Sequence, residues 1–364
     1  MRKILQIFIL SIVVYNFSFA QDSSSFLSGV AKNLSISGYV DTYISYDNDK
    51  GKSLRKFPYM DAYRDEFRLN IAQATLHYNS DFARATMTVQ FGDLPYLTWP
   101  ENERYIQEAN IGFSPLNNLW IDAGYYITHI GAESGKSIEN FFSVTSLCDY
   151  YEPNFQSGIR VSYSFSDKLS AQLHFVNGYN VLADNNKNKS FGLNLDYKVT
   201  PKTEITFNNL TGNEAPSSLN RTQVRVYNNM VLSTALSKKI DMLISADYCW
   251  QQNSKLSDST KSAGMFSGFV AVRYRLSKKI SFAVRGETFQ DKNAIFSAPF
   301  VFEDGHIEGV TASGMSFDIQ YSPVGNSYVR LEVRDLILKS GYNIFNNKSK
   351  NTRTEVVLSS GLEF

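Results

Sequence analysis

The sequence predicts an all-β protein: a transmembrane up-and-down antiparallel β-barrel of about 16 strands, with short periplasmic turns and long extracellular loops. Three observations predict this fold. Apolar and polar residues alternate with a period of two from about residue 34 to the end of the chain. Short and long connections between these segments also alternate, and the chain begins with the pattern of a secretory signal peptide. Segments of about 9–14 residues are long enough to cross a bilayer at the usual strand tilt.

The first 20 residues match a signal peptide. Two basic residues precede an apolar stretch that ends near Phe19, and residues 18–20 fit the small-x-small cleavage pattern. Polar residues interrupt the stretch, which disfavours a membrane anchor. We therefore expect cleavage after residue 20, a short N-terminal segment over residues 21–33, and one outer-membrane barrel domain over residues 34–364. Such a protein would lie in the outer membrane of a Gram-negative bacterium.

The strand pattern is clearest in Phe82–Asp93, Ser190–Val199 and Ile240–Trp250. In Ser190–Val199, apolar residues at alternate positions form one face, and glycine and polar residues form the other. This is the pattern of a strand with one apolar and one polar environment. The phase slips near Ala72, which predicts a β-bulge.

The connections favour a barrel over a β-sandwich, which alternation alone would also fit. Short connections such as 200–202 and 277–279 are rich in residues that suit tight turns. Long connections such as 130–154 and 290–308 fall between them. Every other hairpin end then lies on the same side of the sheet, as in an up-and-down barrel. The last strand ends at Phe364, which resembles the C-terminal insertion signal of outer-membrane barrels.

Composition excludes several other classes. The 36 basic and 35 acidic residues give a net charge of +1, so no basic surplus predicts nucleic-acid binding. Two cysteines among 364 residues exclude a disulfide scaffold. Beyond the N-terminus, no apolar run approaches the length of a transmembrane helix. No Walker A, H-E-x-x-H or nucleophile-elbow motif occurs and the four histidines are isolated in the sequence, so we expect no enzyme activity, cofactor or metal site.

Four segments carry a resemblance to a known family. They are LSISGYVDTYISYD (34–47), QATLHYNSDFARATMTVQFGD (73–93), QEANIGFSPLNNLWIDAGYYITHIGAES (107–134) and YYEPNFQSGIRVSYSFSDKLSAQLHFVNGYN (150–180). These segments resemble the β-barrel porin-2, OmpL-like family of Gram-negative outer-membrane porins. The resemblance implies a water-filled channel for passive diffusion of ions and small hydrophilic solutes, embedded in outer-membrane lipid, with a homotrimer as one candidate assembly. A structural or adhesive barrel whose long loops bind partners stays open as the alternative.

The strand faces opposite the predicted lipid face carry many charges. Burying them in a dry core would be prohibitive unless all were paired, whereas a water-filled lumen removes that penalty. A barrel of this strand number is wide enough for such a channel. The predicted pore-lining residues are Arg84, Glu108, Asp122, Arg160, Arg225, Asp247, Arg273, Arg275, Arg285, Glu287, Asp318, Arg330, Glu332, Arg334 and Glu355.

Basic residues concentrate on three strands near the C-terminus, at 273–275, 285 and 330–334. They could form an open basic wall that favours anions, since charged rings and ladders set ion preference in pores. Acidic residues share the same faces, so local ion-pair ladders that rigidify the wall explain the pattern equally well.

The long connection over residues 130–154 is the third in order, the position of the loop that folds inward and narrows porins of similar strand number. Its aromatic and charged composition suits packing against a wall, although a solvated external loop remains the alternative. The predicted constriction residues are Glu133, Lys136, Glu139, Asp149 and Glu152. Cys148 in this connection and Cys249 on a predicted lumen face would be two free thiols or a bridge; spacing does not decide.

Overall fold

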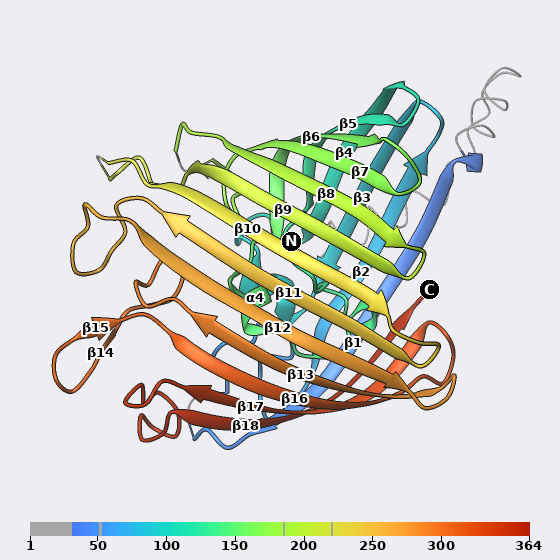
Figure 1. Cartoon of the computed structure of the whole chain (residues 1–364). Helices are drawn as coiled ribbons and strands as arrows, with labels where there is room; N and C mark the ends of the chain where they lie inside the picture. Colours follow the sequence, from blue (N-terminus) through green and yellow to red (C-terminus); the bar gives the residue numbers. More distant parts are fainter. Residues whose placement is uncertain (1–30, 51–52, 185, 220) are drawn as a thin grey trace, which may run out of the picture.

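The chain forms a closed antiparallel barrel (Figure 1). The computed structural model describes residues 31–50, 53–184, 186–219 and 221–364, so the predicted signal peptide lies outside the described residues. Sixteen strands close the barrel, as the sequence predicts. They are β1 (Leu34–Asp47), β2 (Phe67–Asn79), β3 (Ala83–Phe91), β4 (Ile106–Leu116), β5 (Leu119–Ile127), β6 (Phe155–Ser164), β7 (Leu169–Val176), β8 (Ser190–Thr200), β9 (Thr203–Asn213), β10 (Val224–Ala235), β11 (Ile240–Gln251), β12 (Ala263–Arg275), β13 (Ile280–Gln290), β16 (Thr311–Tyr321), β17 (Ser327–Leu338) and β18 (Thr352–Glu363).

The first and last strands pair with each other. The β1–β18 register runs from Tyr39 opposite Glu363 to Asp47 opposite Glu355. Each of the other barrel strands pairs with its neighbours along the chain, which is the up-and-down order. Closure satisfies the backbone hydrogen bonds that an open sheet would leave exposed to lipid.

The two ends of the barrel differ. Short turns and both ends of the strand series lie on the right in Figure 1, and the longer connections lie on the left. The connection between β13 and β16 carries a separate small hairpin, β14 (Phe300–Val301) and β15 (Ile307–Glu308). The predicted alternation of short and long connections is therefore confirmed.

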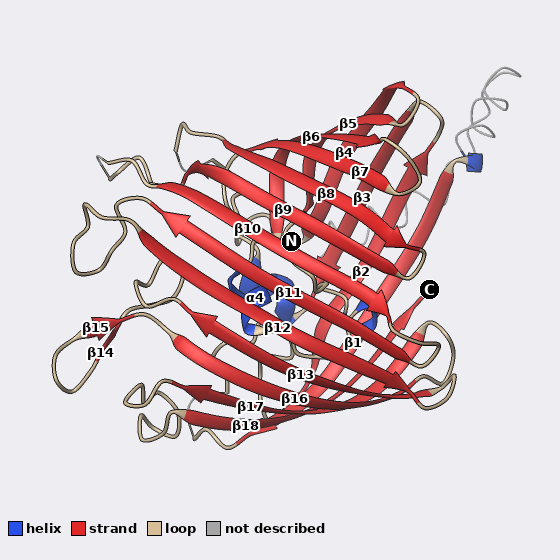
Figure 2. Ribbon diagram, in the orientation of Figure 1, coloured by secondary structure: helices blue, strands red, loops and turns tan. Residues whose placement is uncertain are grey.

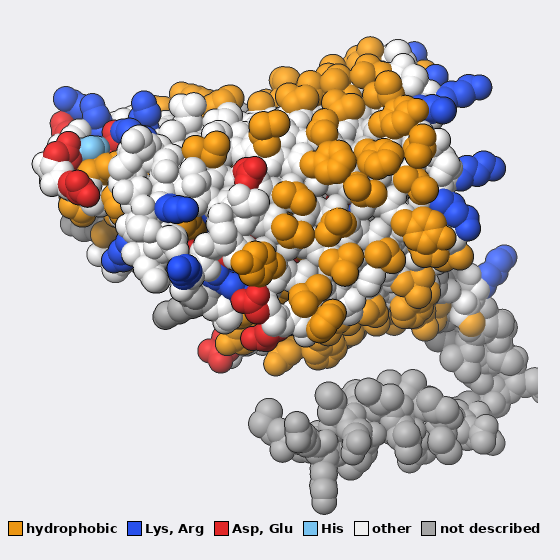
Figure 3. Space-filling view, turned by 90° about the horizontal axis from the view of Figure 1, so that it is seen from below, with side chains coloured by type: hydrophobic (Ala, Val, Ile, Leu, Met, Phe, Trp, Pro, Cys, Tyr) orange, Lys and Arg blue, Asp and Glu red, His pale blue; other side chains and the backbone are white. Residues whose placement is uncertain are grey.

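The two faces of the strands also follow the predicted alternation. In β17, Val329, Leu331 and Val333 are exposed, whereas the intervening Arg330, Glu332 and Arg334 are buried. Figure 3 shows hydrophobic side chains covering the outer surface near the short-turn end, with a rim of lysines and arginines beyond them. A period of two places alternate side chains of such a strand on opposite faces; towards the long connections the pattern changes, because Leu336 and Leu338 are buried inside and Asp335 is exposed.

A bulge in β2 lies at Asn70, two positions from the predicted phase slip at Ala72. Asp41 pairs with Ile71 and Thr42 pairs with Leu69, so Asn70 has no partner on β1. The Asn70 side chain donates to Asp41 Oδ2 at 3.1 Å and accepts from the Asp61 backbone N–H at 3.1 Å. The bulge thus turns Asn70 into the lumen, where it holds the connection between β1 and β2.

Short helical segments occur in the long connections. They are α3 (Asp93–Thr98), η1 (Ser137–Glu139) and α4 (Leu147–Tyr151). Figure 2 shows α4 within the outline of the barrel, where it contacts β12 and β13. Over the described ranges, no helix is long and apolar enough to span a membrane.

The face assignment predicts opposite outcomes for neighbouring substitutions in β7. Leu173 is 60% exposed on the outer surface, and Gln172 faces the lumen beside Asn194. Leu173→Arg should lower the free energy of unfolding by about 2–4 kcal/mol, because it places a charge against lipid. Gln172→Arg should lower it by less than about 1 kcal/mol. Urea unfolding in lipid vesicles measures both, and equal losses would contradict the assignment.

Candidate functional site

The connection between β5 and β6 lies inside the barrel and bonds to its wall. The backbone N–H groups of Ser143 and Val144 both donate to Glu332 Oε2 at 2.9 Å. The N–H of Leu147 donates to Glu287 Oε2 at 2.6 Å. Irregular backbone buried in this way needs partners for its polar groups. Wall glutamates supply acceptors that secondary structure would otherwise provide.

Wall arginines supply the complementary donors. Arg330 donates to the carbonyl oxygens of Ser137 and Asn140, each at 3.1 Å. Arg285 donates to the carbonyl oxygen of Val144 at 3.0 Å. Both arginines are at most 2% exposed. The predicted basic residues at these positions are therefore anchors for the inward connection and do not line open water.

The same arginines belong to a buried ion-pair network. Arg285 lies 2.9 Å from Glu133, 3.7 Å from Glu332 and 3.9 Å from Glu287. Arg334 lies 2.6 Å from Glu287 and 3.5 Å from Glu355. A buried charge without a partner is strongly destabilising, so this density of charge requires such pairing. The geometry favours paired ladders over the open basic wall.

A second inward connection, described over residues 48–50 and 53–66, was not recognised from the sequence. Arg55 lies 2.9 Å from Glu355, and Arg64 lies 2.6 Å from Asp47. Arg353 joins the same network, 2.5 Å from Glu355. Asp47 and Arg353 share the inward phase of their strands, so alternation alone could have identified them. Nothing in the sequence of the connection itself reveals that it folds inward.

Other predicted lumen residues also form local groups. Asp122 forms ion pairs with Arg84 and Arg160, with N···O distances of 2.5 and 3.1 Å. Arg273 and Arg275 both pair with Asp241, at 3.2 and 2.5 Å.

Three further predicted lumen charges are paired, hydrogen-bonded or packed. Asp318 lies 3.7 Å from Arg330. Asp247 accepts hydrogen bonds from Asn229 and Ser267 at 2.7 and 2.9 Å. The Arg225 guanidinium stacks over two aromatic rings and donates to Gln251.

The lumen near the long connections has an apolar filling. Leu147, Tyr227, Phe289 and Phe345 belong to one buried cluster within it. Cys148 and Cys249 are both free and buried, so no bridge pins the inward connection. Burial of Glu152 beside the charge of Asp247 raises the pKa of the Glu152 carboxyl. Side chains of this cluster therefore fill the lumen around α4, near the long connections.

The histidines are less isolated than their spacing in the sequence indicates. The rings of His129 and His174 stack with centroids 4.0 Å apart. Tyr126 hydrogen bonds to His174 at 3.3 Å. In the part of the chain that the structure describes, no group of three or more histidine, cysteine or acidic side chains is arranged to hold a metal ion.

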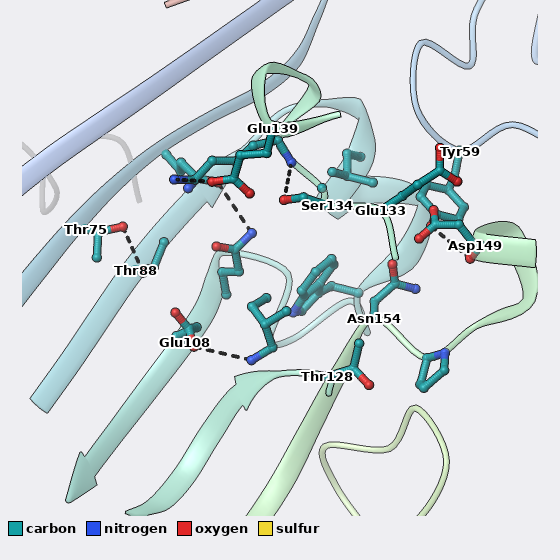
Figure 4. A pocket seen from close by; sticks show the side chains of 18 of the residues that line it. Tyr59, Thr75, Thr88, Glu108, Thr128, Glu133, Ser134, Glu139, Asp149 and Asn154 are labelled. Atoms are coloured by element: carbon teal, nitrogen blue, oxygen red, sulfur yellow. Dashed lines mark hydrogen bonds and ion pairs between the residues drawn. The ribbon is translucent and has the colours of Figure 1, made fainter. Parts of the chain in front are cut away.

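An open cavity lies on the other side of the inward connection, against β1 to β5 (Figure 4). Its volume is about 340 Å³. Ser37 and His77 line it towards the short turns, and Trp99 and Pro153 line it towards the long connections. Four carboxylates also line the cavity: Glu108, Glu133, Glu139 and Asp149.

Two of these carboxylates have cationic partners. Glu133 pairs with Arg285, and Lys136 lies 3.5 Å from Glu139 and 2.8 Å from Glu363. Glu108 accepts the Ile127 N–H at 3.3 Å, and Asp149 accepts the Tyr59 hydroxyl. Burial, and then the charge of Glu133, raise the pKa of Asp149 to about 7.

Comparisons with known proteins agree with this architecture. Residues 33–364 match one protein family, described as "Putative beta-barrel porin-2, OmpL-like". A comparison with curated protein sequences finds no match. Three solved structures have a similar fold at identities of 12% or less, so they bear on the fold alone.

An anion-selective porin from Comamonas acidovorans has a TM-score of 0.59 at 10% identity, covering 91% of this chain and 99% of that chain. Salmonella typhi OmpF in complex with daunomycin has a TM-score of 0.61 at 12% identity, covering 91% and 97%. OmpT of Vibrio cholerae in its trimer form has a TM-score of 0.57 at 10% identity, covering 91% and 99%.

The ion-pair network predicts a large effect at Arg285. Arg285→Leu should lower the free energy of unfolding by about 3–5 kcal/mol, because Glu133 and Glu332 would stay buried with less compensation. The control is Arg275→Leu, since the Arg275 side chain is 43% exposed and Asp241 retains Arg273. The control should lose about 1 kcal/mol or less. Guanidinium unfolding followed by circular dichroism compares them; similar losses would refute the anchoring role.

The pKa of Asp149 predicts that stability falls with rising pH. The folded protein keeps this proton up to about pH 7, whereas an ordinary carboxyl loses it near 3.8. Folding therefore takes up a proton in this window, and the Asp149 contribution decreases from about pH 4 to about pH 7. The groups facing Asp149 are Tyr59, Thr145, Glu133, Glu152 and Arg285.

Thermal denaturation at pH 5 and pH 8 measures this dependence. Asp149→Asn should lose less stability between the two values than the unaltered protein. An unchanged difference would mean that Asp149 is ionised throughout.

Proposed function

The chain belongs to the β-barrel porin-2, OmpL-like family and is an outer-membrane channel protein, and we propose that ions and small hydrophilic solutes diffuse passively along one side of its lumen. One observation carries the proposal. The cavity against β1 to β5 extends from residues near the short turns to residues in the long connections. The opposite side is closed by the inward connection and its buried ion pairs.

The lining of the cavity suits hydrated solutes. Thr75, Thr88, Thr128 and Asn154 present hydroxyl and amide groups to it (Figure 4). Such groups replace some of the water around a polar solute without binding it tightly, as conduction requires. Among the predicted pore-lining residues, Glu108 borders the proposed path, whereas Arg285, Glu287, Arg330, Glu332 and Arg334 hold the closed side.

The inward fold of two connections also bears on the alternative of an adhesive barrel. Residues 53–66 and 128–154 contact the lumen wall and so present less surface outside the barrel. This arrangement supports restriction of a channel over binding of partners by these loops. We also propose that the protein is not an enzyme and requires no cofactor.

Orientation and assembly complete the proposal. The short turns would face the periplasm and the long connections the exterior, as in other outer-membrane barrels. The apolar outer surface would contact outer-membrane lipid after export by the cleavable signal peptide at residues 1–20. The trimer form of a structurally similar protein supports a homotrimer as the candidate assembly.

Deletion of Lys136–Val144 tests whether the inward connection between β5 and β6 narrows the channel. The deletion removes the part of the inward connection that Arg330 and Glu332 hold against the wall. We expect single-channel conductance in planar bilayers to rise, because the closed side of the lumen would fill with electrolyte.

The matched control deletes Lys255–Lys261, an exposed stretch between β11 and β12. This variant should keep the original conductance. Unchanged conductance in an inserted Lys136–Val144 deletion would count against the constriction, and a protein that never conducts would refute the channel.

A further inference from the structure

Two carboxylates of the cavity have no cationic partner in the protein. Among the described residues, neither Glu108 nor Asp149 forms an ion pair, whereas Glu133 pairs with Arg285 and Glu139 with Lys136. Figure 4 shows Glu108 on its strand and Asp149 on the short helix, on opposite sides of the cavity. The cavity therefore has two sites at which a cationic group would supply the missing partner.

A buried hydrogen-bond donor in the same cavity also lacks a partner. Trp99 lines the cavity and is only 7% exposed. Its indole Nε1 has no hydrogen-bond partner in the described part of the chain. The ring packs against Phe155 with centroids 5.1 Å apart, which fixes the position of the donor. Nε1 itself exposes almost no surface, so a solute oxygen reaches this N–H, which can only donate, after a local shift of the neighbouring side chains.

The positive group of the cavity is already engaged. Lys136 Nζ lies 2.8 Å from Glu363 and 3.5 Å from Glu139. An anionic solute would therefore meet Glu108 and Asp149 without a free cation to balance it. The volume of about 340 Å³ lies at the lower end of the range for small-molecule sites.

We propose that this cavity is a binding site for small hydroxylated amines, in which Glu108 and Asp149 attract the ammonium group and the Trp99 indole donates to a hydroxyl oxygen. The inference rests on the proposed function, because it names the solute class that the passage favours. The threonine hydroxyls and amides of the lining pair with the remaining solute hydroxyls.

The state of Asp149 agrees with an absent cationic partner. Burial and the neighbouring Glu133 raise the pKa of Asp149 to about 7. An ammonium group beside this carboxylate would favour its charged form. Weak, reversible occupancy of this kind assists entry and still permits release, as conduction requires.

Three hexoses of similar size provide the test: glucosamine, glucose and glucuronate. At neutral pH, glucosamine is positively charged, glucose is uncharged and glucuronate is negatively charged. Each is added to single channels in a planar bilayer in potassium chloride, and the reduction of current is measured against concentration. Glucosamine should block half-maximally at a concentration about tenfold lower than glucose, as expected for one charged hydrogen bond. Glucuronate should block least.

Glu108→Gln tests the contact, since it removes the charge and keeps the size of the side chain. The block by glucosamine should weaken about tenfold. The control is Glu303→Gln, the same change at an exposed position between β14 and β15. It should leave the block unaltered. Equal block by glucosamine and glucose, or an unchanged block in Glu108→Gln, would overturn the binding site. Conductance in potassium chloride would still support the channel function in that case.

Tryptophan fluorescence of the refolded protein in micelles gives an independent readout. Glucosamine should shift the emission in a saturable way, and Trp99→Phe should abolish that shift. A persistent shift in Trp99→Phe would overturn the role of the indole. If the protein does not conduct, the channel function fails, and this titration still decides whether the cavity binds amines.

Discussion

The structure depends on hydrogen bonds from the barrel wall to the peptide N–H and C=O groups of an irregular segment inside the lumen. The connection over residues 128–154 leaves peptide groups in the lumen that no strand pairs. Glu287 and Glu332 accept its N–H groups, and Arg285 and Arg330 donate to its carbonyl oxygens. The same four side chains neutralise one another and Glu133 or Asp318. Removing one partner would unbalance both a charge and a peptide group, which is why the inward fold is held as a unit.

This arrangement makes the lumen asymmetric. Most of its charge lies on the closed side, where Arg285, Arg330 and Arg334 each have an acidic neighbour at short range. Fields from such pairs fall off quickly with distance, so they contribute little to the cavity against β1 to β5. The few carboxyl groups there without a cationic partner, above all Glu108 and Asp149, have a larger influence on a passing solute. A count of lumen charges is therefore a poor guide to selectivity in this barrel.

The reliability of sequence reasoning varied with the range of the interaction. Alternation placed Val329, Leu331 and Val333 outside and Arg330, Glu332 and Arg334 inside, and the strand number and order of connections were confirmed. The bulge lay two positions from its predicted place. Asp47 and Arg353 were missed although their phase identifies them. No local pattern in the sequence indicated the inward fold of residues 53–66 or the stacking of His129 on His174.

The sequence by itself determined the barrel, its number of strands and the face on which each strand residue lies. These features depend on a period of two within single strands, a local property that any segment displays. Only the tertiary structure decided which inward charges face water and which are paired and buried. Inside the lumen, Glu133 meets Arg285 and Lys136 meets Glu363, although the partners are 152 and 227 residues apart in the sequence. Spacing in the sequence carries no record of such contacts, because the path of the connections in space creates them.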